Sequence, residues 1–235
     1  GFPDVTGILA LLAHWIELVA AVAWVGSIAF SSLILPAVSH RLDPVVSEAE
    51  GIRLRAALRT AILALLLASS LTLLLQAYSL AEGDWSAVLG GPALGNILSD
   101  QYGRLWAVRQ GLALLALAAT FALSTAQTAP RRDDLRIAGE RGSLALTARL
   151  SLALGLVYLY LLAASGHAAS ADVGTLTGSH LVSAGVFLDW LHLLGVALWF
   201  GGQIYLALVL VPAIGAAPDW RSATRPFLEA LNRFS

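Results

Sequence analysis

The hydrophobic positions of the chain fall into five long runs, separated by shorter polar segments. Each run has about twenty or more residues, the length that an α-helix needs to cross the hydrocarbon core of a bilayer. Backbone groups in lipid must be hydrogen-bonded within their own segment, and no alternating β-barrel pattern competes, so the runs predict helices. The predicted spans are residues 7–35, 56–81, 104–126, 144–169 and 181–211.

The first and fifth runs share a pattern of aromatic and small residues at an offset of 175 positions. The matched positions are Trp15 with Trp190, Trp24 with Trp199, and Gly26 with Gly201. This predicts a single transmembrane domain, residues 1–235, with a first repeat over about 7–169 and a second, incomplete repeat that starts near 181. Residues 227–235 look like the beginning of a sixth helix. Trp24 and Trp199 lie deep in their spans, so we expect both to pack in the core.

The polar segments alternate in charge along the chain. The segments after the first, third and fifth runs are rich in arginine. The segment after the second run carries acidic residues and has no arginine before Arg104, and the segment after the fourth carries an aspartate and no arginine. The positive-inside rule then predicts that the arginine-rich segments are cytoplasmic and that the N-terminus is outside. The arginines that decide this are Arg41, Arg53, Arg55, Arg59, Arg131, Arg132, Arg136, Arg141, Arg149, Arg221, Arg225 and Arg233.

Composition agrees with an all-α, polytopic membrane bundle of five complete spans. The chain is 58% hydrophobic and 12% charged, whereas soluble domains are about 25% charged. A net charge of −1 gives no reason to expect a nucleic-acid partner. The chain has neither cysteine nor methionine, which excludes thiolate and thioether metal ligands. No nucleophile–base pair or phosphate-binding loop is visible, so we do not expect an enzyme.

The predicted topology gathers four of the five histidines in the outer half of the membrane. They are His14, His167, His180 and His192. Glu17 follows His14 by three positions and Asp189 precedes His192 by three, so each acid shares a helix face with its histidine. Charged groups within a span are costly and often functional. The candidate metal site therefore consists of His192, His167, His14, Asp189 and Glu17, with polar pairs that merely tie helices together as the simpler alternative.

Arg109 lies more than a turn inside the third predicted span. A buried arginine needs a carboxylate partner, and Glu17 and Asp189 are at compatible depths. We expect a structural ion pair between Arg109 and one of these acids.

Several motifs together resemble the CopD/PcoD copper-resistance family of bacterial inner-membrane proteins, which includes YcnJ-like copper-uptake proteins. The motifs are Ser-Gly-His-Ala-Ala at 165–169, Asp-Trp-Leu-His-Leu-Leu at 189–194, Leu-Trp-Phe-Gly-Gly at 198–202 and Tyr-Gly-Arg-Leu-Trp at 102–106. The resemblance implies a multi-pass protein of the inner membrane that transports or handles copper. It points to His167 and His192, and then to His14, as copper ligands.

Two other interpretations stay open. Histidines on two helices near one face could bind haem, with arginines at its propionates, which would make the chain an electron-transfer subunit. The chain could instead be a structural accessory subunit of a larger membrane complex. The expected partners are the lipid bilayer and either a periplasmic copper-binding protein or such a complex.

Overall fold

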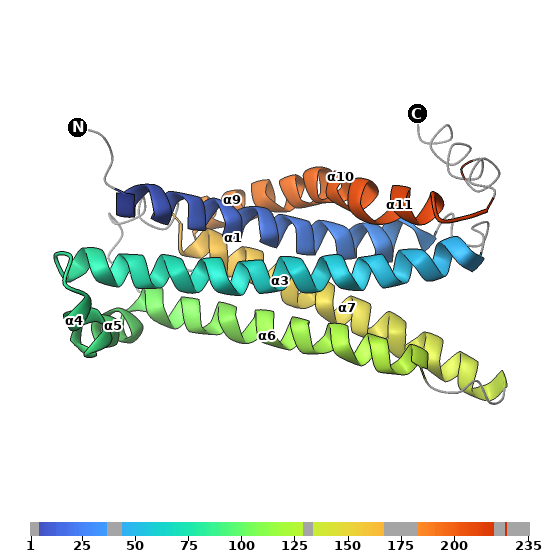
Figure 1. The fold of residues 1–235 in the computed structure, drawn as a ribbon, viewed down its shortest axis with the longest axis horizontal. Coiled ribbons are helices and arrows are strands. Elements are labelled where there is room, and N and C mark those ends of the chain that lie inside the picture. Colours follow the sequence, from blue (N-terminus) through green and yellow to red (C-terminus); the bar gives the residue numbers. More distant parts are fainter. Residues whose placement is uncertain (1–4, 37–43, 129–133, 167–182, 219–223, 225–235) are drawn as a thin grey trace.

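In the computed structural model, the described residues are 5–36, 44–128, 134–166, 183–218 and 224, with side chains for all of them except 122–128 and 134–145. The long helices lie side by side along the longest axis of the molecule, and successive helices run in opposite directions (Figure 1). The described residues contain no strand. The predicted all-α fold is therefore confirmed for this part of the chain.

The helices follow one another in five long segments. The first is α1 (Val5–Ala29), which continues into the π-helical turn η1 (Phe30–Ile34); the next three are α3 (Pro44–Leu80), α6 (Gln101–Thr128) and α7 (Asp134–Ala164). The fifth consists of α9 (Ala184–Val196), η2 (Ala197–Gly201), α10 (Gly202–Tyr205), η3 (Leu206–Leu210) and α11 (Val211–Ile214), and we call it helix 5. The short helices α4 (Trp85–Leu89) and α5 (Pro92–Ser99) connect α3 to α6.

Four segments are long and apolar enough to cross a membrane. They are Val5–Ile34, Pro44–Leu80, Leu146–Ala164 and Ala184–Ile214. The described part of α6 opens with a polar stretch, residues 101–110, and is not among them. The chain is thus a multi-pass helical membrane protein, and the fifth span stays a prediction.

Helix boundaries differ from the predicted ones at three places. α3 begins at Pro44 instead of residue 56, because the Glu-, Ala-, Leu- and Arg-containing segment before the apolar run has good helix propensity. α7 ends at Ala164. Helix 5 continues past Pro212 to Ile214, three residues beyond the predicted end at residue 211.

The short helices α4 and α5 lie at the end of the bundle where α1 begins, beside the end of α3 and the start of α6 (Figure 1). The hydroxyl and backbone N–H of Ser86 donate to Asp84 Oδ1 at 2.7 and 2.8 Å, so Asp84 caps α4. These hydrogen bonds hold the pKa of the exposed Asp84 carboxyl below its usual value, and the bond from the Ser86 hydroxyl has the larger effect.

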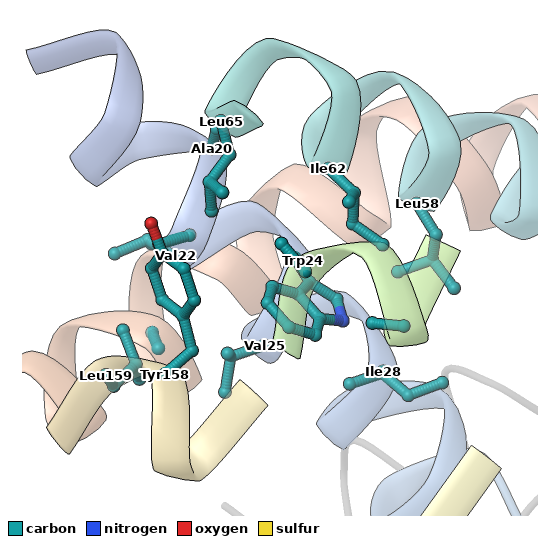
Figure 2. Packing of buried hydrophobic residues seen from close by; sticks show 14 of the residues in the cluster. Ala20, Val22, Trp24, Val25, Ile28, Leu58, Ile62, Leu65, Tyr158 and Leu159 are labelled. Carbon is teal, nitrogen blue, oxygen red and sulfur yellow. The ribbon is translucent and has the colours of Figure 1, made fainter. Parts of the chain in front are cut away.

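The core is built around α1, which contacts α3, α7 and helix 5. Figure 2 shows the Trp24 indole between side chains of α3 and the Tyr158 ring of α7. The two rings meet edge to face, with centroids 5.7 Å apart, and the indole Nε1 donates to Ser151 Oγ at 3.2 Å. Trp24 is therefore a core residue, as expected. Trp199 is 72% exposed on the outer surface of helix 5, so the same expectation was wrong there.

Backbone contact between two glycines holds α1 against helix 5. A Cβ on Gly26 would meet the carbonyl oxygen of Ala197 and lie 2.5 Å from the Gly201 Cα. A Cβ on Gly201 would meet the carbonyl oxygen of Val22 and lie 2.8 Å from the Gly26 Cα. Small residues allow such close approach between helices in lipid, where packing replaces the hydrophobic effect as the driving force.

We predict that Gly201→Ala destabilises the purified chain by about 1–3 kcal/mol, because the added methyl group separates the two backbones. Gly195→Ala on the same helix is the matched control, since a Cβ there meets nothing within 4 Å. Alanine is favoured over glycine within a helix by about 0.5–1 kcal/mol, so the control should melt at the same or a higher temperature. Thermal unfolding in detergent, followed by circular dichroism, checks this. Equal melting temperatures for the two variants would contradict the contact.

Candidate functional site

A polar cavity of about 350 Å³ lies where α1, the start of α6 and the end of α7 meet. Its lining residues are His14, Glu17, Tyr102, Arg109, Leu162, Ser165 and Gly166. We call it the outer cavity, because the charge pattern predicts that this end of the bundle faces outward. His14 is exposed, whereas Glu17, one turn deeper, is 2% exposed. The spacing of three therefore turns the histidine to the opening and the acid to the protein interior.

Glu17 is the centre of a buried polar network. Arg109 Nη1 lies 3.1 Å from Glu17 Oε1, and the side chains of both residues are 3% exposed. Tyr158 Oη donates to the same oxygen at 2.9 Å. Of the two acids expected to pair with Arg109, the structure thus selects Glu17. A charged pair away from water needs such additional hydrogen bonds to offset its desolvation.

The Tyr158 hydroxyl is a member of this network that the sequence analysis missed. It lies in an apolar stretch of α7, in which the sequence analysis named no polar candidate before the motif at 165–169. A tyrosine in an apolar span could have indicated this role, since the hydroxyl of a buried tyrosine usually finds a hydrogen-bond partner. Tyr102 was also missed as a cavity residue, because the sequence analysis named it only as part of the motif at 102–106.

Asp189 lies near the cavity from the side of helix 5. Its Oδ2 would be 3.8 Å from a Cβ built on Gly166, a residue that lines the cavity. Gly166 directly precedes His167, which lies outside the described residues. The end of α7 therefore brings Asp189 into the neighbourhood of His14 and Glu17.

His192 has a different position from the one the spacing suggested. It is exposed and does not line the cavity, while Asp189 is half-buried. Residues three apart differ by about 60° around an α-helix. That rotation is enough for the acid to face α7 while the histidine faces outward.

Metal-binding geometry is incomplete in the part of the chain that the structure describes. No group of three or more histidine or acidic side chains there could hold a metal ion. His14 is the imidazole at the cavity, and Glu17 already accepts hydrogen bonds from Arg109 and Tyr158. A ligand set of three would thus need a residue such as His167.

A larger cavity, of about 720 Å³, lies between α1, α3 and helix 5. It is mostly apolar, and its charged lining residue is Arg53. None of the candidate histidines or acids lines it. Its chemistry suits hydrocarbon, not a metal ion, so the smaller outer cavity is the candidate site.

We predict that Arg109→Ala lowers the stability of the folded chain by about 3–5 kcal/mol, because it leaves the Glu17 carboxylate buried without a cation. Adding Glu17→Gln should restore part of this loss, since the neutral amide needs no counter-charge. Asp189→Asn, combined with Arg109→Ala, is the control and should restore nothing. Thermal unfolding of the single and double variants decides. If the stability lost in the Arg109→Ala, Glu17→Gln double variant equals the sum of the losses in the two single variants, the two residues do not form a pair.

Comparison with known proteins gives a match to a protein family. The model of the family described as copper resistance protein D-like, N-terminal domain, matches residues 5–177, which include α1 to α7 and the lining of the outer cavity. No curated protein and no solved structure matches the chain. The resemblance noted from the sequence motifs is thereby confirmed. A match over most of the chain shows that this protein belongs to the copper resistance protein D-like family.

Proposed function

We propose that the protein binds copper at the outer cavity and passes it into or across the inner membrane. The observation that carries this proposal is the convergence of His14, Glu17 and Asp189 near Gly166 at the end of α7, in a member of a copper-resistance family. Copper is here the cargo. The other candidate classes, a haem-binding subunit and a structural subunit, have no comparable structural observation in their favour.

The residues would have different roles in this site. His14 and Asp189 are the described groups that could reach the metal, with His167 as the third ligand. Glu17 is held by Arg109 and Tyr158, so we assign it the role of positioning residue. His192, exposed on helix 5, would receive copper before it enters. Nitrogen and oxygen ligands without sulfur suit copper(II), or a weak copper(I) site that releases the ion readily.

We predict that His14→Ala and His167→Ala each weaken copper binding by the purified chain at least tenfold. His192→Ala should lower the rate of copper binding by a larger factor than it lowers the affinity for copper. His40→Ala is the control, because the charge pattern of the sequence predicts that His40 lies on the cytoplasmic side. Copper titration, followed by metal analysis, provides the measurement. Wild-type affinity in both the His14 and His167 variants would rule out the site, and a Soret band would favour haem.

Copper affinity should fall as the pH decreases through about 6.5, the pKa of histidine in model peptides, because only neutral imidazole binds a metal. The same titration repeated between pH 5 and 8 tests this. The His14→Ala variant should lose part of the pH dependence. An affinity that stays constant over this range would exclude imidazole ligands.

The proposal requires that the outer cavity open to the periplasm, with the N-terminus outside. The chain has no cysteine, so single cysteines can report orientation directly. Ser86 in α4 and Ser47 near the start of α3 are both exposed and lie at opposite ends of the bundle (Figure 1). Ser86→Cys should react with a membrane-impermeant reagent added to intact cells, and Ser47→Cys should react only after lysis. The reverse pattern would overturn the orientation.

We also infer that α1 and helix 5 are two copies of one unit. The close contact supports this, because it is made by matching positions of the two helices. Gly26 lies against Ala197, and the 175-residue offset converts this pair into Gly201 and Val22, which also lie against each other. The π-helical turns also match. Adding 175 to the residue numbers of η1 gives 205–209, which differs from the position of η3, Leu206–Leu210, by one residue. A twofold relation would place the His14–Glu17 and Asp189–His192 pairs at matching depths.

A further inference from the structure

A second buried carboxylate lies at the end of the bundle opposite the outer cavity. Glu50, in the second turn of α3, is 8% exposed. Tyr205 Oη donates to Glu50 Oε1 at 2.6 Å, and Ser31 Oγ lies 3.4 Å from the same oxygen. The three residues come from α3, helix 5 and η1. The carboxyl group thus joins three separate segments.

Glu50 has no compensating cation among the residues that the structure describes. Among the described residues, no arginine or histidine nitrogen lies within ion-pair distance of it, in contrast to Glu17 and Arg109. The charge that reaches Glu50 is that of Arg55, five residues further along α3, and Tyr205 is the titratable group that faces it from helix 5. Tyr205 also belongs to a buried apolar cluster, in which the Phe30 ring stacks on it with centroids 5.0 Å apart.

Burial of a carboxylate without a cation costs several kcal/mol, and the usual solution is that the group takes up a proton. The hydrogen bonds leave room for one. Both hydroxyl contacts are with Oε1. Oε1 therefore acts as the acceptor oxygen, and Oε2 is free to carry a hydrogen.

The backbone around the cluster is also unusual. Ser31 belongs to the π-helical turn η1, and Tyr205 directly precedes the π-helical turn η3. Single π-turns inside α-helices occur frequently at functional sites, where they shift side chains into positions that a regular helix would not give. Two such turns therefore flank one buried acid.

We propose that Glu50 is a proton-binding site, with the proton on Oε2 and with Tyr205 and Ser31 as fixed donors to Oε1. The proton is exchanged with water at the end of the bundle where α3 begins. This inference does not depend on copper, and it concerns a different end of the molecule from the proposed metal site.

Infrared spectroscopy of the full chain in detergent at pH 7 tests the proposal, because a protonated carboxyl group has a C=O band that a carboxylate lacks. We expect this band in the wild type and its loss in Glu50→Gln. Glu17→Gln and Glu48→Gln are matched controls, one paired with Arg109 and one exposed on the same helix as Glu50. Both should keep the band. Absence of the band in the wild type, or its persistence in Glu50→Gln, would overturn the proposal.

Tyr205→Phe provides a second readout if Glu50→Gln does not fold. Loss of the hydrogen bond to Oε1 should move the C=O band to higher frequency, whereas an unmoved band would mean that another carboxyl group produces it. Sodium is the competing occupant. Raising sodium at constant pH should leave the band unchanged, and its disappearance would identify a sodium site instead.

Discussion

The ion pair between Arg109 and Glu17 joins helices that apolar packing alone does not bring together at this point. α6 packs mainly on α3 and α7, and the long arginine side chain reaches from α6 to the carboxylate on α1. Tyr158 adds α7 to the same oxygen. In a low-dielectric interior neither charge can lose its partner cheaply, so this one contact fixes the relative positions of the three helices that form the outer cavity.

The two buried acids show how differently one residue type can be accommodated. Glu17 has a guanidinium group and a phenol beside it, so it can stay charged and hold its neighbours in place. Glu50 has only hydroxyl groups as hydrogen-bond donors, so its charge is not balanced by any described neighbour. The first arrangement suits a permanent structural charge. The second suits a group that gains and loses a proton.

The level of Arg109 and Glu17 along the bundle could be predicted from the sequence, but the rotation of each helix about its axis could not. Hydropathy located the runs, and depth limited the partners of Arg109 to two acids, one of which the structure pairs with it. The outward direction of His192 and the exposure of Trp199 depend on which face of helix 5 meets its neighbours. That choice follows from the contact between Gly26 and Gly201, and spacing within a single helix does not encode it. The π-helical turns have no recognised sequence signal, so they too appeared only in the structure.

Gly26 also determines how the two ends of the molecule are related. It lies between Glu17 at the outer cavity and Ser31 beside Glu50, two residues of the first long helical segment that are about 21 Å apart along its axis. Because the backbones touch there, α1 and helix 5 cannot slide past each other without steric overlap. A rotation of one helix about this contact would move Asp189 relative to His14 at one end and Tyr205 relative to Ser31 at the other. The close glycine contact therefore makes the geometry of each polar cluster depend on the same pair of helices.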